Sequence, residues 1–231
     1  MDERCQCLLL ARNERLLLTG EMADIHVFCG PRVWNLHRAI LCPVSTWFQK
    51  AVGNRWLSTY PRYIVLDNKS PVMMYNLFYY LYTDKTHPLL KESLGNPKTI
   101  FEACGNVLET SKYFGAKDFQ SLLAGPLDRV FERQVSLLER LRDAMGEDTW
   151  NSPDFDAILP DATFVAEFFR FAKLVYSDDF FKPTRKVVQS FFKKAGFQAF
   201  RNKRFQHKIS KVPGLASDLL RVLVVEVMDM D

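Results

Sequence analysis

Metal binding and catalysis depend most often on histidine and cysteine, and the chain has four of the first and five of the second. They are His26, His37, His87 and His207, and Cys5, Cys7, Cys29, Cys42 and Cys104. The cysteines do not form two pairs with the spacing of a zinc site, and no histidine has a partner at ligand spacing. The sequence therefore predicts no metal site and reduced, mostly buried thiols.

Sequence motifs of known active sites are also missing. The chain has no glycine-rich loop for phosphate, no Gly-x-Ser-x-Gly segment and no His-Glu-x-x-His segment. The adjacent acids Asp178 and Asp179 flank the end of a predicted helix, where we expect them to contact solvent. The sequence thus predicts no catalytic residues, no cofactor and no enzymatic activity.

Basic residues are concentrated in one segment, although the net charge of the whole chain is only +4. Residues 182–211 contain ten Lys and Arg and no acid. The candidate basic patch comprises Lys193, Lys194, Arg201, Lys203 and Arg204. With phenylalanines between its charges, the patch could bind nucleic acid, serve as a nuclear-import signal or dock an acidic partner. Alternatively it is a solvated helix face, which the helical core spacing of Phe191 and Phe192 favours.

Short strands followed by helices are predicted for the first half of the chain. The predicted elements are a helix over 6–18, a hairpin of 24–30 and 32–37 with Gly30-Pro31 between its strands, two short helices separated by Pro43, a strand over 63–66, and a helix begun by Ser70 and Pro71. Ser45 is the expected cap of the second short helix. Residues 85–97 are predicted as a polar loop, followed by a helix begun by Asn96-Pro97.

Helices alone are predicted after Gly125-Pro126, the best candidate for a domain boundary. Apolar residues at helical spacing begin near Leu127, near Asp161 and at Pro183, and the last helix is predicted from about Ser217. Strands followed by helices indicate an α+β fold and not the alternating order of a parallel-sheet enzyme.

Three segments resemble the BTB/POZ domain family, in the family's order and spacing. They are ADIHVFCGPRVWNLHRAILCPVSTWF (residues 23–48), YYLYTDKT (79–86) and TSKYFGAKDF (110–119). Asp84 stands where the family usually has glycine. The resemblance extends over about residues 16–124 and is closest to fungal members. It implies a small mixed β-sheet packed with a helical cluster, here followed by an all-helical C-terminal extension.

The resemblance divides the chain into a leading amphipathic helix at residues 1–20, a BTB/POZ domain at 21–125 and a helical extension at 126–231. It implies a protein–protein interaction module that homodimerises or acts as a scaffold. In family dimers the leading helix contacts the partner protomer, and the leucines that match are Leu9, Leu10, Leu16 and Leu17. So many leucines suit a symmetric interface. The alternative is a helix that folds back on its own core.

A charged pocket lies at the dimer groove of some family members. The matching residues are Asp24 and Arg38, with His37 beside them. A buried carboxylate without a cation is unfavourable, so the pair could equally stabilise the fold without a ligand. We expect His37 to orient its neighbours by hydrogen bonding and not to act as a base.

Cullin scaffolds of ubiquitin ligases bind many family members through a hydrophobic residue and a nearby glutamate. Trp56 can supply the first, but Ser58 stands in place of the second. A cullin adaptor therefore remains a second hypothesis, and a nucleic-acid-associated regulator a third. No secretory signal and no run of ~20 apolar residues is visible. We expect an intracellular protein of the nucleus or cytoplasm with protein partners and no membrane association.

Overall fold

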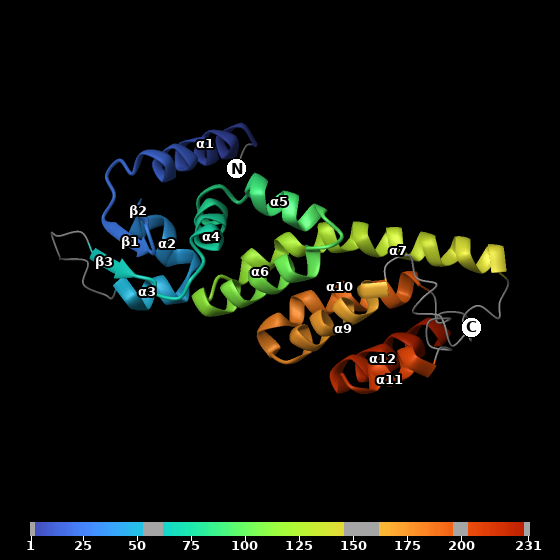
Figure 1. Ribbon diagram of the computed structural model, residues 1–231. Helices are drawn as coiled ribbons and strands as arrows, with labels where there is room; N and C mark the ends of the chain where they lie inside the picture. Colours follow the sequence, from blue (N-terminus) through green and yellow to red (C-terminus); the bar gives the residue numbers. More distant parts are fainter. Residues whose placement is uncertain (1–2, 53–61, 146–161, 196–202, 229–231) are drawn as a thin grey trace. The chain divides into compact units, whose positions relative to one another are not determined.

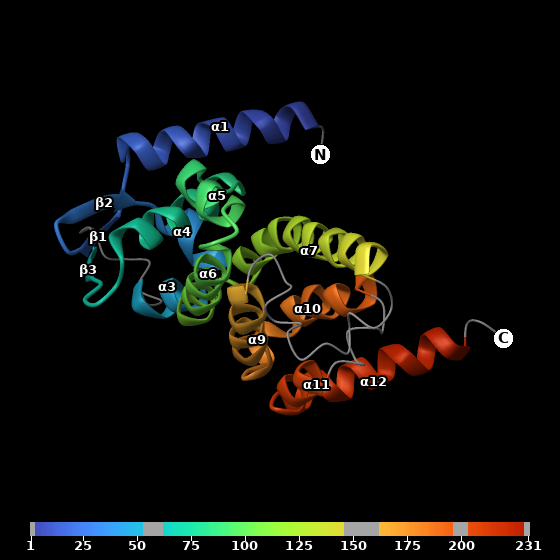
Figure 2. The ribbon, with the colours of Figure 1, turned by 45° about the vertical axis from the view of Figure 1, so that its right-hand side comes forward.

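The computed structural model describes residues 3–52, 62–145, 162–195 and 203–228 (Figure 1). It consists of two compact units, the first made of residues 1–95 and 106–122, the second of 96–105 and 123–231. Helices dominate both units, and the strands belong to the first (Figures 1 and 2). Within the described ranges, no helix is long and apolar enough to cross a membrane.

The first unit contains a three-stranded sheet of order β2-β1-β3. Strand β1 (Ile25–Cys29) pairs antiparallel with β2 (Arg32–Leu36) and parallel with β3 (Arg62–Val65). Every second residue of β1 is buried, as expected for a strand with one face on the core. The predicted hairpin, third strand and mixed sheet are thus confirmed.

Seven helical segments occur among the residues described within 3–52 and 62–123. They are α1 (Glu3–Thr19), α2 (Arg38–Val44), α3 (Thr46–Val52), α4 (Pro71–Thr83), α5 (Pro88–Gly95), α6 (Ile100–Phe114) and the 3-10 helix η1 (Lys117–Leu123). The predicted caps are confirmed, because Ser45 Oγ accepts from Phe48 N (3.2 Å) and Ser70 Oγ accepts from Met73 N (3.4 Å). Ser45 also donates to Phe114 O (2.6 Å) and so joins α3 to the end of α6.

The predicted polar loop over residues 85–97 is wrong, because α5 occupies its centre. Leu90 and Leu94 lie one helical turn apart and are 2% and 1% exposed. Pro88 stands at the first helical position, where a proline loses no hydrogen bond. Two buried leucines are therefore enough to fold a segment whose other residues look like a loop.

Helix α1 packs against α4 and the end of β2. Tyr79 donates from its hydroxyl to Glu14 of α1 (3.2 Å). Gly20 ends the helix with φ +65, and a Cβ there would lie 2.6 Å from Asn35 Cβ. Glycine thus allows both the left-handed turn and the close approach of α1 to β2.

The second unit contains a helical cluster built around phenylalanine side chains. Its main elements are α7 (Ala124–Met145), α9 (Ala162–Tyr176), the 3-10 helix η3 (Asp179–Phe181), α10 (Lys182–Lys194), α11 (Lys203–Ser210) and α12 (Pro213–Met228). Phe168 is fully buried, with the rings of Phe191 and Phe192 at 4.8 and 5.6 Å. Gly125 and Pro126 lie in the first turn of α7.

The ends of this cluster differ from the sequence prediction in two places. The last helix begins at Pro213 and not near Ser217, since proline is favourable in a first turn and Leu215 is fully buried. Helix α11 was not predicted, because its eight residues are mostly polar. Ile209, 6% exposed, marks its buried side.

Candidate functional site

Asp24 and Arg38 lie next to each other at the end of the β1–β2 hairpin that is opposite its turn. Asp24 precedes β1 and Arg38 begins α2 directly after β2, so antiparallel pairing brings the two residues together. Arg38 donates from its main-chain N to Asp24 Oδ1 (2.8 Å) and from Nε to Oδ2 (3.0 Å). The carboxylate therefore satisfies a free N–H in the first turn of α2 as well as the guanidinium. The Arg38 side chain is 10% exposed and that of Asp24 44%.

His37 lies beside this pair and connects three elements. Its main-chain N donates to the Tyr82 hydroxyl (2.9 Å), which in turn donates to His37 Nδ1 (2.8 Å). Nε2 then carries the proton and donates to Glu21 O (2.7 Å). Burial raises the pKa of Tyr82, which keeps the phenol protonated as this network requires. Both ring nitrogens of His37 are occupied, so the residue orients α2 against its neighbours.

The structure thus brings Asp24, His37 and Arg38 together. Two members of the network were missed from the sequence: Tyr82 of α4 and the main chain of Glu21. Tyr82 lies in the segment resembling the family's tyrosine-rich run, but that pattern does not identify its partner. No group of three or more acidic, histidine or cysteine side chains in the described part of the chain could hold a metal ion.

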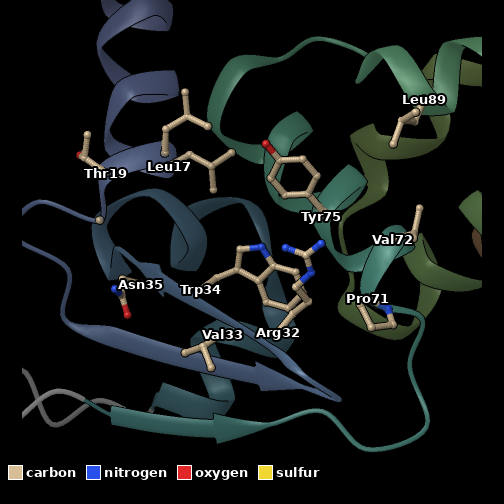
Figure 3. Close-up of a pocket in the computed structure, with 12 residues that line it drawn as sticks. Leu17, Thr19, Arg32, Val33, Trp34, Asn35, Pro71, Val72, Tyr75 and Leu89 are labelled. Atoms are coloured by element: carbon tan, nitrogen blue, oxygen red, sulfur yellow. The ribbon is translucent and has the colours of Figure 1, made fainter.

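A cavity of about 530 Å³ opens between α1, β2, α4 and α5 of the first unit (Figure 3). Its apolar wall is formed by Leu17, Leu18, Val33, Trp34, Pro71, Val72 and Leu89. Thr19, Gly20, Asn35 and Tyr75 complete the lining together with Arg32, the only charged residue among the described ones that line it. Nothing in the sequence singled out this cavity, because its residues come from four separate segments.

Comparison with known proteins identifies the first half of the chain. A model of the BTB/POZ domain family matches residues 13–124. The chain is a BTB/POZ-domain protein. The matched region contains the sheet, the hydrogen-bonded network of His37 and the cavity. The BTB/POZ domain is a protein–protein interaction module, and the partners of this chain are therefore proteins. A search of curated proteins found no match to the chain.

Tyr82 should stabilise the BTB/POZ domain through its hydroxyl. Tyr82→Phe would leave the main-chain N–H and Nδ1 of His37 without their partner in a site where His37 is 8% exposed. We expect the free energy of unfolding to fall by about 1–3 kcal/mol, measured by urea unfolding followed by circular dichroism. Tyr63→Phe is the matched control, since Tyr63 is 70% exposed. Equal losses in the two variants would contradict the role of the hydroxyl.

The leucines of α1 differ in how far they are buried. Leu17 is 7% exposed and belongs to the core, while Leu10 and Leu16 are half-buried. Leu9 is 46% exposed. Leu8 and Leu18, which flank these positions, are each 68% exposed. The helix therefore folds back on its own core with the side that carries Leu17, and its exposed leucines lie at separate positions around the rest of the helix.

The predicted cullin contact, Trp56 and Ser58, lies outside the described residues. So does Arg201 of the basic patch, and of Lys203 and Arg204 the structure describes only their place in α11. Lys193 is exposed at the end of α10. The adjacent residue, Lys194, donates to Glu132 Oε1 (2.9 Å) and lies 3.5 Å from Asp128 Oδ1.

Proposed function

We propose that this BTB/POZ-domain protein homodimerises through α1 and presents the dimer as a scaffold for other proteins. The exposed leucines of α1 carry the proposal. Leu8, Leu9 and Leu18 are 68%, 46% and 68% exposed, although Leu17 of the same helix is anchored in the core. A helix fixed to its own unit by one side holds these leucines in place for a partner.

A second copy of the chain is the occupant that suits this surface best. In a two-fold symmetric dimer the same surface occurs on both protomers, so α1 would contact the same helix of its copy. Each leucine removed from water would contribute about 1.5–3 kcal/mol. A few such side chains on each protomer can offset the loss of translational and rotational freedom on association.

Sedimentation of the full chain tests the proposal. We expect the wild-type protein to sediment as a dimer and Leu9→Lys to sediment as a monomer at the same concentration. Leu220→Lys is the matched control, because Leu220 is 63% exposed but lies on α12 of the second unit, and it should remain dimeric. A monomeric wild-type chain, or a dimer that Leu9→Lys leaves intact, would contradict the proposal.

The two other hypotheses have less support from the described residues. Lys194, one of the five basic-patch residues, is held by Asp128 and Glu132, and its hydrogen bond to Glu132 raises its pKa. Its charge is therefore partly neutralised within the unit, which favours a solvated helix face over nucleic-acid binding. No described residue supports or opposes a cullin contact at Trp56, so the adaptor hypothesis remains a prediction from the resemblance.

A further inference from the structure

The cavity of the BTB/POZ domain lies along an open edge of its sheet. Strand β2 pairs only with β1, so its other edge has no partner strand among the described residues. Four consecutive residues of β2, Arg32 to Asn35, line the cavity. Side chains of a strand alternate between its two faces, so a cavity on one face would be lined by every second residue only. The cavity must therefore border the edge itself (Figure 3).

Main-chain groups of β2 point into this edge. Arg62 N donates to Asp24 O (3.1 Å) and Leu66 N to Phe28 O (2.8 Å). The main-chain N–H and C=O groups of the even-numbered residues of β1 therefore point to β3, and those of the odd-numbered residues point to β2. The β2 residues paired with those odd-numbered residues are Arg32, Trp34 and Leu36. The main-chain N–H and C=O of Val33 and Asn35 then point away from β1, toward the open edge.

Arg32 gives the edge its chemical preference. Among the described residues, its guanidinium has neither an ion-pair nor a hydrogen-bond partner, and no acid lines the cavity. Figure 3 shows Arg32 together with Trp34 and Tyr75 among the residues that line the cavity. Trp34 packs on Phe78 with 5.3 Å between ring centroids but keeps part of its surface open. A carboxylate is the group that a guanidinium in such an apolar setting binds best.

The walls of the cavity are suited to an apolar side chain next to that carboxylate. Val72 of α4 is 59% exposed and Leu89 of α5 is 55% exposed, and both face the cavity across from β2. Val33 is 53% exposed at the edge itself. A single added strand would cover these three side chains and at the same time satisfy the main-chain groups of Val33 and Asn35.

We propose that the open edge of β2 binds an extended segment of a partner protein, in which an acidic and an apolar residue are two positions apart. Residues two apart on a strand point to the same face, so the acid would lie opposite Arg32 and the apolar residue opposite Trp34. Main-chain hydrogen bonds would supply affinity, and the two side chains specificity. The inference rests on the proposed interaction function. The cavity shares Leu18 with the proposed dimer surface, but Leu9, the residue that tests the dimer, does not line it.

Selection from displayed peptides tests this proposal on the full chain. The probes are two matched libraries of short random peptides, one with a fixed Asp-x-Leu and the other with Asn-x-Leu, each also in the reverse order. We expect binders from the aspartate library only. A binder, labelled with a fluorophore, should lose about tenfold or more in affinity to Arg32→Glu, because the ion pair becomes a repulsion.

Two proline variants separate edge pairing from simple pocket binding. Val33→Pro removes the N–H at the open edge of β2 without breaking its pairing with β1 and should weaken peptide binding about tenfold. Val65→Pro is the matched control, since Val65 is 64% exposed and points its main chain to the opposite edge of the sheet, along β3. The peptide affinity of the Val65→Pro variant should equal that of the wild-type chain. Circular dichroism checks that both variants fold.

Several outcomes would overturn the proposal. They are the absence of binders, equal binding from the asparagine library, or binding that Arg32→Glu and Val33→Pro leave unchanged. Loss of a dimer in Val33→Pro would show that the edge pairs with a second copy and would overturn the proposed occupant. Leu9→Lys distinguishes this proposal from the dimer, because it should abolish dimerisation and leave peptide affinity unchanged.

Discussion

Phe168→Ala should lower the free energy of unfolding of the second unit by about 3–5 kcal/mol. Phe168 is fully buried, and its ring lies 4.8 Å from that of Phe191, 5.7 Å from Phe131 and 5.9 Å from Phe164. It therefore joins α7, α9 and α10 at one point. Truncation removes the contacts of this ring with three helices at once and leaves a cavity that they cannot fill by moving independently.

Hydrogen exchange resolved by peptide is the measurement for this prediction. Protection should fall most in peptides from α7, α9 and α10. Leu220→Ala, a change in the same unit at a side chain that is 63% exposed, should alter stability by no more than about 0.5 kcal/mol. Unchanged protection of α9 and α10 in Phe168→Ala would show that this ring is not the centre of the cluster.

Gly115→Ala should destabilise the BTB/POZ domain by roughly 2–4 kcal/mol. Gly115 follows α6 with φ +63, a conformation that is unfavourable for any residue with a Cβ. A Cβ there would also overlap Thr46 Oγ1 and lie 3.2 Å from Thr46 Cβ. The strain would also reach Ser45, which precedes Thr46 in the chain. The Ser45 hydroxyl joins α3 to Phe114.

Gly95→Ala is the matched control for this substitution. Gly95 ends α5 without a positive φ, and a Cβ there would have no atom of the described residues within 4 Å. Its replacement should be neutral or slightly stabilising, because alanine restricts the unfolded chain more than glycine does. Urea unfolding of the two variants measures the difference. Similar midpoints would contradict the expected strain at Gly115.

Local signals predicted most of the sheet and the helix starts correctly. Gly30-Pro31 between alternating segments predicted the hairpin, and Ser70-Pro71 predicted the start of α4. These signals act over a few residues, so they survive in a single sequence. Helix α5 was missed because its burial depends on Leu90 and Leu94 reaching a core formed by distant segments, which no local pattern shows.

The candidate sites divide in the same way. Asp24 and Arg38 could be paired from a resemblance, because the hairpin between them fixes their distance. Tyr82 could not, since its contact with His37 spans 45 residues and depends on how α4 crosses α2. The cavity was even harder to predict from the sequence, because its lining comes from four separate segments. The charge of Arg32 matters there only because no acidic residue among the described ones lies beside it.

The mixed sheet also has a kinetic consequence. Strands β1 and β2 are joined by Gly30 and Pro31 alone, so their hairpin can close within microseconds. Strand β3 is separated from β1 in the sequence by β2, α2 and α3. Pairing β3 with β1 closes this longer loop and therefore loses more chain entropy. We therefore expect β3, at four residues the shortest strand, to join last. Contacts formed so late mainly slow unfolding, so β3 would set how long the domain stays folded.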